Sequence, residues 1–154
     1  MSRSIVCGVD GSPDSNAAVI VAARMAEQLG ARLILAHVAE PVLTYAHAVP
    51  FGGLSMAGPL AEDELMAAQE ESGARMLEEA AGVAGLSDAV RRVTVGLPAE
   101  QLAEIADEEG AELVVVGSRG RGAFKAAFLG SVSSSLVGIA RCPVLIVPPG
   151  AGSP

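Results

Sequence analysis

Five short apolar runs alternate with four longer amphipathic segments along this chain, and this alternation constrains the fold more than any other feature of the sequence. The apolar runs have the partly β-branched character of strands and cover residues 4–9, 32–38, 90–95, 112–116 and 143–148. The segments between them place apolar residues at helical spacing and cover residues 15–29, 62–84, 98–109 and 131–140. Because several runs are apolar throughout, as parallel strands buried on both faces are, the sequence predicts an α/β fold with a doubly wound five-stranded parallel sheet.

The length of 154 residues fits a single domain, which we expect to cover residues 1–148, followed by a disordered tail at 149–154. Hydrophobic residues make up 51% and aromatic residues 3% of the chain, so the core must be mainly aliphatic. No stretch approaches the roughly 20 apolar residues of a membrane span, and we expect a cytoplasmic protein with no membrane partner. Cys7 and Cys142 lie far apart beside apolar runs and are interpreted as buried thiols, without the Cys or His clusters of a metal site.

The charge balance limits the class of partner. Eighteen Asp and Glu residues against ten Lys and Arg give a net charge of −8. Such a field repels the phosphate backbone of nucleic acids, so we expect no nucleic-acid partner. A small nucleotide is still compatible with this charge, because local N–H donors can outweigh a distant and diffuse field.

A turn rich in glycine and serine follows the fourth predicted strand. It begins Gly117-Ser118-Arg119-Gly120, and after nine more residues the chain continues Gly130-Ser131-Val132-Ser133. Glycines allow the backbone to approach an anion closely, and the N-terminus of the following helix offers unpaired N–H donors. The pattern indicates a phosphate-binding turn, and an ordinary surface loop is the alternative. Arg119, Arg121 and Lys125 add positive charge here, or simply solvate the surface.

Ligands of open parallel sheets bind beyond the carboxyl ends of the strands. Three such ends, Val9-Asp10, His37-Val38 and Val116-Gly117, are therefore candidates for one crevice. Asp10 either orders the turn before the next helix, which Asp14 or Ser15 caps, or contacts a ribose hydroxyl or a phosphate-bound Mg²⁺ through water.

Catalytic signatures are weak in this sequence. His37 is interpreted as a core histidine with a hydrogen-bond partner, and His47 has no identifiable partner. Neither GxxxxGK[ST] nor GxGxxG occurs, which argues against a P-loop enzyme and a Rossmann dehydrogenase. Residues 39–60, rich in proline, glycine and apolar side chains, are expected to form a flap or a contact surface. We predict no catalytic residue.

The spacing Gly117-x2-Gly120-x9-Gly130-Ser131, with residues 5–12 and the ending 141–147, resembles the ATP-binding subgroup of the universal stress protein family over nearly the whole chain. The resemblance implies a Rossmann-like nucleotide-binding fold, ATP and Mg²⁺ as cofactors, and a stress-response sensor or regulator. Val38 would hold adenine through its backbone, and Asp10 would lie near the ribose or contact Mg²⁺ through water. Strand residues Val144, Leu145, Ile146 and Val147 would pair with a second copy in a homodimer. The full set of implied nucleotide-binding residues is Val9, Asp10, Val38, Val116, Gly117, Arg119, Gly120, Gly130, Ser131, Val132 and Ser133.

Three other functions remain open at this stage. Related folds cleave ATP at the α-phosphate with an SGGxDS pattern, from which residues 10–15 depart, so slow ATP hydrolysis is one alternative to binding alone. Cyclic AMP is another, because it shares the adenine and ribose contacts. A structural dimer without a nucleotide is the third.

Overall fold

The computed structural model describes residues 2–41, 62–120 and 129–152. Several sequence-based predictions fall outside these ranges. They are the flap or contact surface beyond residue 41, the histidine at position 47, and the positive charges of Arg121 and Lys125.

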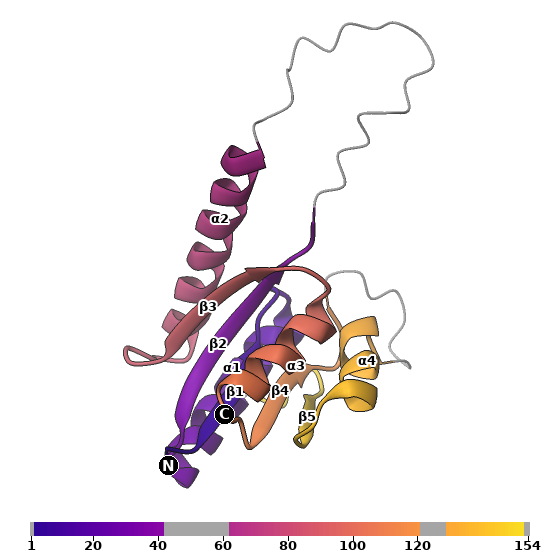
Figure 1. Cartoon of the computed structure of the whole chain (residues 1–154). Helices are drawn as coiled ribbons and strands as arrows, with labels where there is room; N and C mark the ends of the chain where they lie inside the picture. Colours follow the sequence, from indigo (N-terminus) through magenta and orange to yellow (C-terminus); the bar gives the residue numbers. More distant parts are fainter. Residues whose placement is uncertain (1, 42–61, 121–128, 153–154) are drawn as a thin grey trace, which may run out of the picture.

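The described chain forms five parallel strands and four helices in strict alternation (Figure 1), which confirms the predicted α/β fold. The strands are β1 (Ser4–Gly8), β2 (Arg32–Ala39), β3 (Val90–Val95), β4 (Leu113–Gly117) and β5 (Val144–Val147). The helices are α1 (Pro13–Leu29), α2 (Glu62–Val83), α3 (Pro98–Glu108) and α4 (Ser131–Ile139). The sheet order is β3-β2-β1-β4-β5, with all neighbours parallel. The order therefore reverses between β1 and β4.

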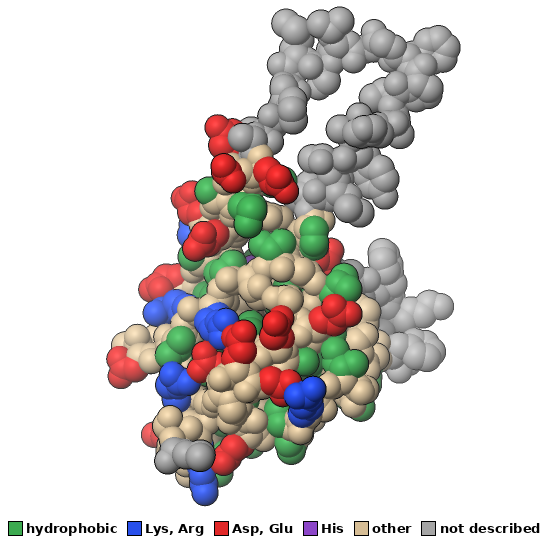
Figure 2. Space-filling model, in the orientation of Figure 1, with side chains coloured by type: hydrophobic (Ala, Val, Ile, Leu, Met, Phe, Trp, Pro, Cys, Tyr) green, Lys and Arg blue, Asp and Glu red, His purple; other side chains and the backbone are tan. Residues whose placement is uncertain are grey.

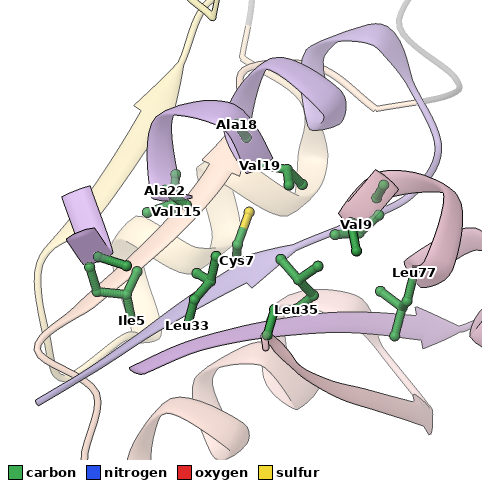
Figure 3. Packing of buried hydrophobic residues seen from close by; sticks show 14 of the residues in the cluster. Ile5, Cys7, Val9, Ala18, Val19, Ala22, Leu33, Leu35, Leu77 and Val115 are labelled. Carbon is green, nitrogen blue, oxygen red and sulfur yellow. The ribbon is translucent and has the colours of Figure 1, made fainter. Parts of the chain in front are cut away.

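Helices cover both faces of the sheet, as predicted. One aliphatic cluster packs α1 and α2 against one face, and a second packs α3 and α4 against the other. Figure 3 shows how Ile5 and Cys7 of β1, and Val9 directly after it, enter the first cluster together with Leu35 and Val115. Because successive side chains of a strand point to opposite faces, Val6 of the same strand enters the second cluster.

The two cysteines differ in their surroundings. Cys7 is fully buried in the first cluster, as expected, and burial raises the pKa of its thiol to about 12. Cys142 is only partly buried at the edge of the second cluster, so the prediction of two buried thiols is wrong for this residue. It lies just before the edge strand β5, where the sheet has no further strand to cover it in the described chain.

Helix α1 begins at a different residue from the one predicted. Ser12, and not Asp14 or Ser15, is the N-cap, and its hydroxyl oxygen accepts the Ser15 N–H at 3.2 Å. The reason is Pro13, which has a fixed φ and no N–H and therefore favours the first helical position. The helix ends at Gly30, which adopts the left-handed conformation with φ 60°, as predicted.

The surface reflects the negative charge of the chain. Figure 2 shows that acidic side chains predominate on the visible face, with arginines interspersed. Arg92 bridges Glu108 and Glu109 at 2.8 and 3.1 Å, and Arg32 also contacts Glu109, so these cations are paired. Among the described helices, none is long and apolar enough to cross a membrane.

The boundary at residue 148 and the tail beyond it stay predictions. Residues 149–152 form a turn after β5, in which the Ala151 N–H donates to the Pro148 carbonyl oxygen. The backbone of Gly152 packs against Ala17 of α1, where an added Cβ would lie 3.1 Å from the Ala17 carbonyl oxygen.

Candidate functional site

A cavity of about 890 Å³ opens at the carboxyl ends of β1, β2 and β4, where the strand order reverses. The three strand ends singled out in the sequence do meet there. All eleven residues predicted to contact a nucleotide line this cavity: Val9, Asp10, Val38, Val116, Gly117, Arg119, Gly120, Gly130, Ser131, Val132 and Ser133. They come from segments more than a hundred residues apart, which the parallel sheet brings to one edge.

One side of the cavity is apolar. Val9, Val38 and Val116 stand at the ends of three neighbouring strands, and each is at most 9% exposed. Leu102 of α3 also lines this side and was not predicted, because in sequence it belongs to an ordinary helical stripe of core residues. Aliphatic walls of this kind suit a flat, largely apolar ring.

Asp10 orders the turn after β1 and also faces the cavity. Its Oδ1 accepts the Ser12 N–H at 2.8 Å, and its own N–H donates to Ser15 Oγ at 3.2 Å. The second carboxylate oxygen lies against Gly120, where an added Cβ would come within 2.7 Å of it. Asp10 can therefore both order the turn and contact a ligand, since one carboxylate oxygen holds the turn and the other lies at the cavity wall.

Ser118, in the turn after β4, forms hydrogen bonds that reach three other elements. Its N–H donates to the Val147 carbonyl oxygen of β5 at 2.9 Å. Its carbonyl oxygen accepts the Gly130 N–H at 2.7 Å and the Ser133 hydroxyl at 3.2 Å, and its own hydroxyl donates to Asp14 Oδ2 at 2.9 Å. This network holds the turn against α1, α4 and β5. Sequence reasoning missed the roles of Asp14 and Ser118, because their contact joins positions 104 residues apart.

The N-terminus of α4 opens on the polar side of the cavity. The helix starts after Gly130, and no side chain in the described chain caps it. The first-turn N–H groups of Ser131, Val132 and Ser133 are therefore left for another acceptor, and the helix dipole makes this end attractive to an anion. The Ser133 hydroxyl donates to the Gly130 carbonyl oxygen at 3.0 Å, so Ser133 offers its N–H more readily than its hydroxyl.

Arg119 supplies a cation to the same side. Its side chain is 25% exposed and lines the cavity, and its Nε lies 3.5 Å from Asp14 Oδ2. Glycines on either side keep the backbone close. At Gly130, for example, an added Cβ would lie 3.3 Å from the Arg119 Cα.

His37 has a hydrogen-bond partner, as predicted, but it is not a core residue. Its Nδ1 lies 2.7 Å from the Val9 carbonyl oxygen, and because a carbonyl only accepts, this nitrogen must carry the proton. The ring is partly exposed and lines the cavity, since β2 extends past β1 at this edge. No group of three potential metal-ligating residues occurs within the described ranges.

Residues 1–148 match the sequence model of the family described as "Universal stress protein family". A protein of Thermus aquaticus, "Universal stress protein in QAH/OAS sulfhydrylase 3'region", is 35% identical over 147 residues, which cover 96% of this chain and 99% of that protein. A universal stress protein of Mycolicibacterium smegmatis is 37% identical over 151 residues, which cover 94% of this chain but only 45% of that protein.

A solved structure similar to this chain holds a nucleotide. The crystal structure of a universal stress protein in complex with cAMP is 30% identical, with a TM-score of 0.62, and the match covers 96% of this chain and 98% of that one.

Proposed function

The chain belongs to the universal stress protein family, and from this premise we propose that it binds ATP and serves as a cytoplasmic sensor or regulator in the stress response. One observation carries the proposal. A single cavity combines an apolar wall with a glycine-rich turn, an uncapped helix N-terminus and an arginine. Support also comes from the similar universal stress protein that was solved in complex with cAMP.

The two sides of the cavity suit the two ends of the ligand. Adenine would lie against the strand-end valines, with Val38 offering its backbone, and Asp10 would accept a hydrogen bond from a ribose hydroxyl. The phosphates would lie between the turn from Gly117 to Gly120 and the start of α4. There, backbone N–H groups and Arg119 donate to anions without disturbing the surrounding bonds.

A magnesium ion would be held at Asp10 through water. One Asp10 oxygen is engaged by the Ser12 N–H, so a single carboxylate oxygen faces the cavity. Mg²⁺ commonly keeps several waters and takes one or two carboxylates together with phosphate oxygens, so this donor set is sufficient. When bound, the ion would neutralise phosphate charge.

Binding is a better match to the cavity than catalysis. The hydroxyl of Ser133, the Nδ1 of His37 and the Oδ1 of Asp10 already hold hydrogen bonds within the protein. We therefore propose at most slow hydrolysis of ATP. Product analysis after incubation with ATP separates the alternatives: ADP indicates a slow ATPase, AMP with pyrophosphate indicates cleavage at the α-phosphate, and unchanged ATP indicates a binder.

Calorimetry with ATP and Mg²⁺ tests the site directly. Gly120→Ala should weaken binding at least about tenfold, because its Cβ would displace the Asp10 carboxylate. Gly138→Ala in α4 is the matched control, since its Cβ would meet no atom within 4 Å. Absence of ATP binding by the unmodified protein, or equal binding by Gly120→Ala, would refute the site. Tighter binding of cAMP than of ATP would establish the second candidate ligand.

We also propose a homodimer through β5. This strand is the edge of the sheet in the described chain, and residues 143 and 147 direct their carbonyl oxygens toward β4. Because alternate residues of a strand direct their backbone groups to opposite sides, Val144 and Ile146 present theirs to the open edge. Ile146→Pro, which removes an outward N–H, should give a monomer in sedimentation velocity, whereas Ile146→Val should remain a dimer. If Ile146→Pro and Ile146→Val were both monomers, or both dimers, pairing along β5 would be excluded.

A further inference from the structure

Asp14 is a nearly buried carboxylate that the proposed nucleotide contacts leave unexplained. It stands in the first turn of α1 and is 7% exposed. Its Oδ2 accepts the Ser118 hydroxyl at 2.9 Å and lies 3.5 Å from the Nε of Arg119. A buried charge is costly unless it is paired, and these two contacts together with the helix N-terminus provide that compensation.

The carboxylate lies behind Arg119 as seen from the cavity. Among the described residues, Arg119 belongs to the cavity wall and Asp14 does not. An arginine has further N–H donors on its two terminal nitrogens, so a carboxylate held at Nε leaves these free to meet another anion. Close packing fixes the arrangement, because a Cβ on Gly117 would lie within 2.9 Å of three Asp14 atoms.

We propose that Asp14 is a positioning residue that makes the affinity of the site rise with the number of phosphates on the ligand. It holds the Arg119 guanidinium in one orientation toward the phosphate end of the cavity, so that less side-chain entropy is lost when a phosphate binds. The inference rests on the proposed nucleotide binding. It adds the residue that determines which nucleotides are preferred.

Asp14 has two opposing effects on the affinity for phosphorylated ligands, repulsion of the phosphates and positioning of Arg119. Measured affinities show which effect is larger. The carboxylate repels phosphates directly, but it is paired with a cation that stands between it and the cavity. The positioning effect therefore dominates, and Asp14→Asn should weaken the binding of phosphorylated ligands. An asparagine keeps the shape of the side chain and an oxygen for the Ser118 hydroxyl, so the turn itself is preserved.

The test measures dissociation constants for ATP, ADP, AMP and adenosine at one low salt concentration. Asp14→Asn should weaken ATP about tenfold, AMP less, and adenosine less than about twofold. Asp107→Asn is the matched control, because it removes the same charge from α3 at a residue that does not line the cavity. The control should bind all four ligands as the unmodified protein does.

A double-mutant cycle with Arg119→Gln assigns the effect to the pair. The variant carrying both substitutions should bind ATP no more weakly than Arg119→Gln alone, because the two residues act together. Additive losses, equal weakening of adenosine and ATP, or tighter ATP binding by Asp14→Asn would each overturn the proposal.

Arg119→Lys serves if Asp14→Asn does not fold. This variant keeps the charge but lacks the Nε that Asp14 holds, so its preference for ATP over adenosine should shrink. An unchanged preference would show that charge alone is sufficient and would overturn the proposal. Failure of the proposed function looks different, because the unmodified protein would then bind none of the four ligands.

Discussion

Gly117 offers the sharpest test of how the cavity is built. An alanine here would place its Cβ 2.7 Å from the Asp14 carbonyl carbon, 2.8 Å from its Cβ and 2.9 Å from its carbonyl oxygen. Ordinary contact begins near 3.4 Å, so β4 and α1 would have to separate by about 0.7 Å. Two of the three atoms are backbone atoms of a helical turn, which cannot move aside as the end of a side chain can.

The cost follows from this geometry. Overpacking a well-packed site costs about 1–3 kcal/mol, and contacts with backbone favour the upper half of that range. Replacing glycine by alanine within a strand raises the free energy of unfolding by about 0.5–1 kcal/mol, because alanine has less conformational freedom to lose on folding. Gly117→Ala should therefore lower the free energy of unfolding by about 2 kcal/mol, and for a chain of this length the melting temperature should fall by about 4–8 °C.

Urea denaturation is the appropriate assay, with Gly138→Ala as the control. The free energies are compared with one common slope of the free energy of unfolding against urea concentration. Gly138 is in a helix and its added Cβ would meet nothing within 4 Å, so that variant should be more stable by about 0.5–1 kcal/mol. If Gly117→Ala is as stable as the unmodified protein, the close approach of β4 to α1 is wrong, and with it the arrangement of Asp14 behind Arg119.

Two further predictions concern the buried thiol of Cys7 and the glycines of α2. Burial raises the pKa of Cys7 to about 12, so between about pH 9 and pH 12 the unfolded thiol ionises while the folded one stays protonated. The free energy of unfolding should fall as pH rises through this window, by up to about 1.4 kcal/mol per pH unit, and Cys7→Ala should fall less steeply in urea melts. In α2, Gly82→Ala meets open space and should stabilise by about 0.5–1 kcal/mol. Gly73→Ala should destabilise by about 1–3 kcal/mol, because its Cβ would lie 2.8 Å from Val93 and 2.9 Å from His37; equal effects would contradict this packing.

The helices and strands could be predicted from the sequence better than the order of the strands in the sheet. Apolar periodicity located every strand and helix to within about two residues, because burial on one or both faces is recorded locally in the side chains. The start of α1 was misjudged, since Pro13 moves the cap to Ser12 and this effect outweighs the capping preference of Asp14. Strand order left no local signal, because it depends on contacts such as that between Ile5 and Leu113.

The candidate site also contains residues that the sequence predicted and residues that it did not. Gly117, Gly120 and Gly130 could be predicted, because a turn rich in glycine and serine after a buried strand favours an anion and because their spacing resembles the family's motif. Asp14 and Ser118 did not, because a buried acid in a first helical turn looks in sequence like any other acid there. A buried hydrogen bond across 104 residues has no counterpart in a local pattern.

The central place of β1 also bears on how this protein is made. Its edge toward β2 is filled by a segment about 28 residues further along the chain, as in the pair Ser4 and Arg32, whereas its edge toward β4 must wait for residues about 108 positions away, as in the pair Ile5 and Leu113. A nascent chain that pauses before β4 would carry half of the cavity and an open apolar strand edge, which is a template for aggregation. The proposed nucleotide would find no complete site on such a fragment, so it could assist only the last stage of folding, after β4 and the start of α4 have docked.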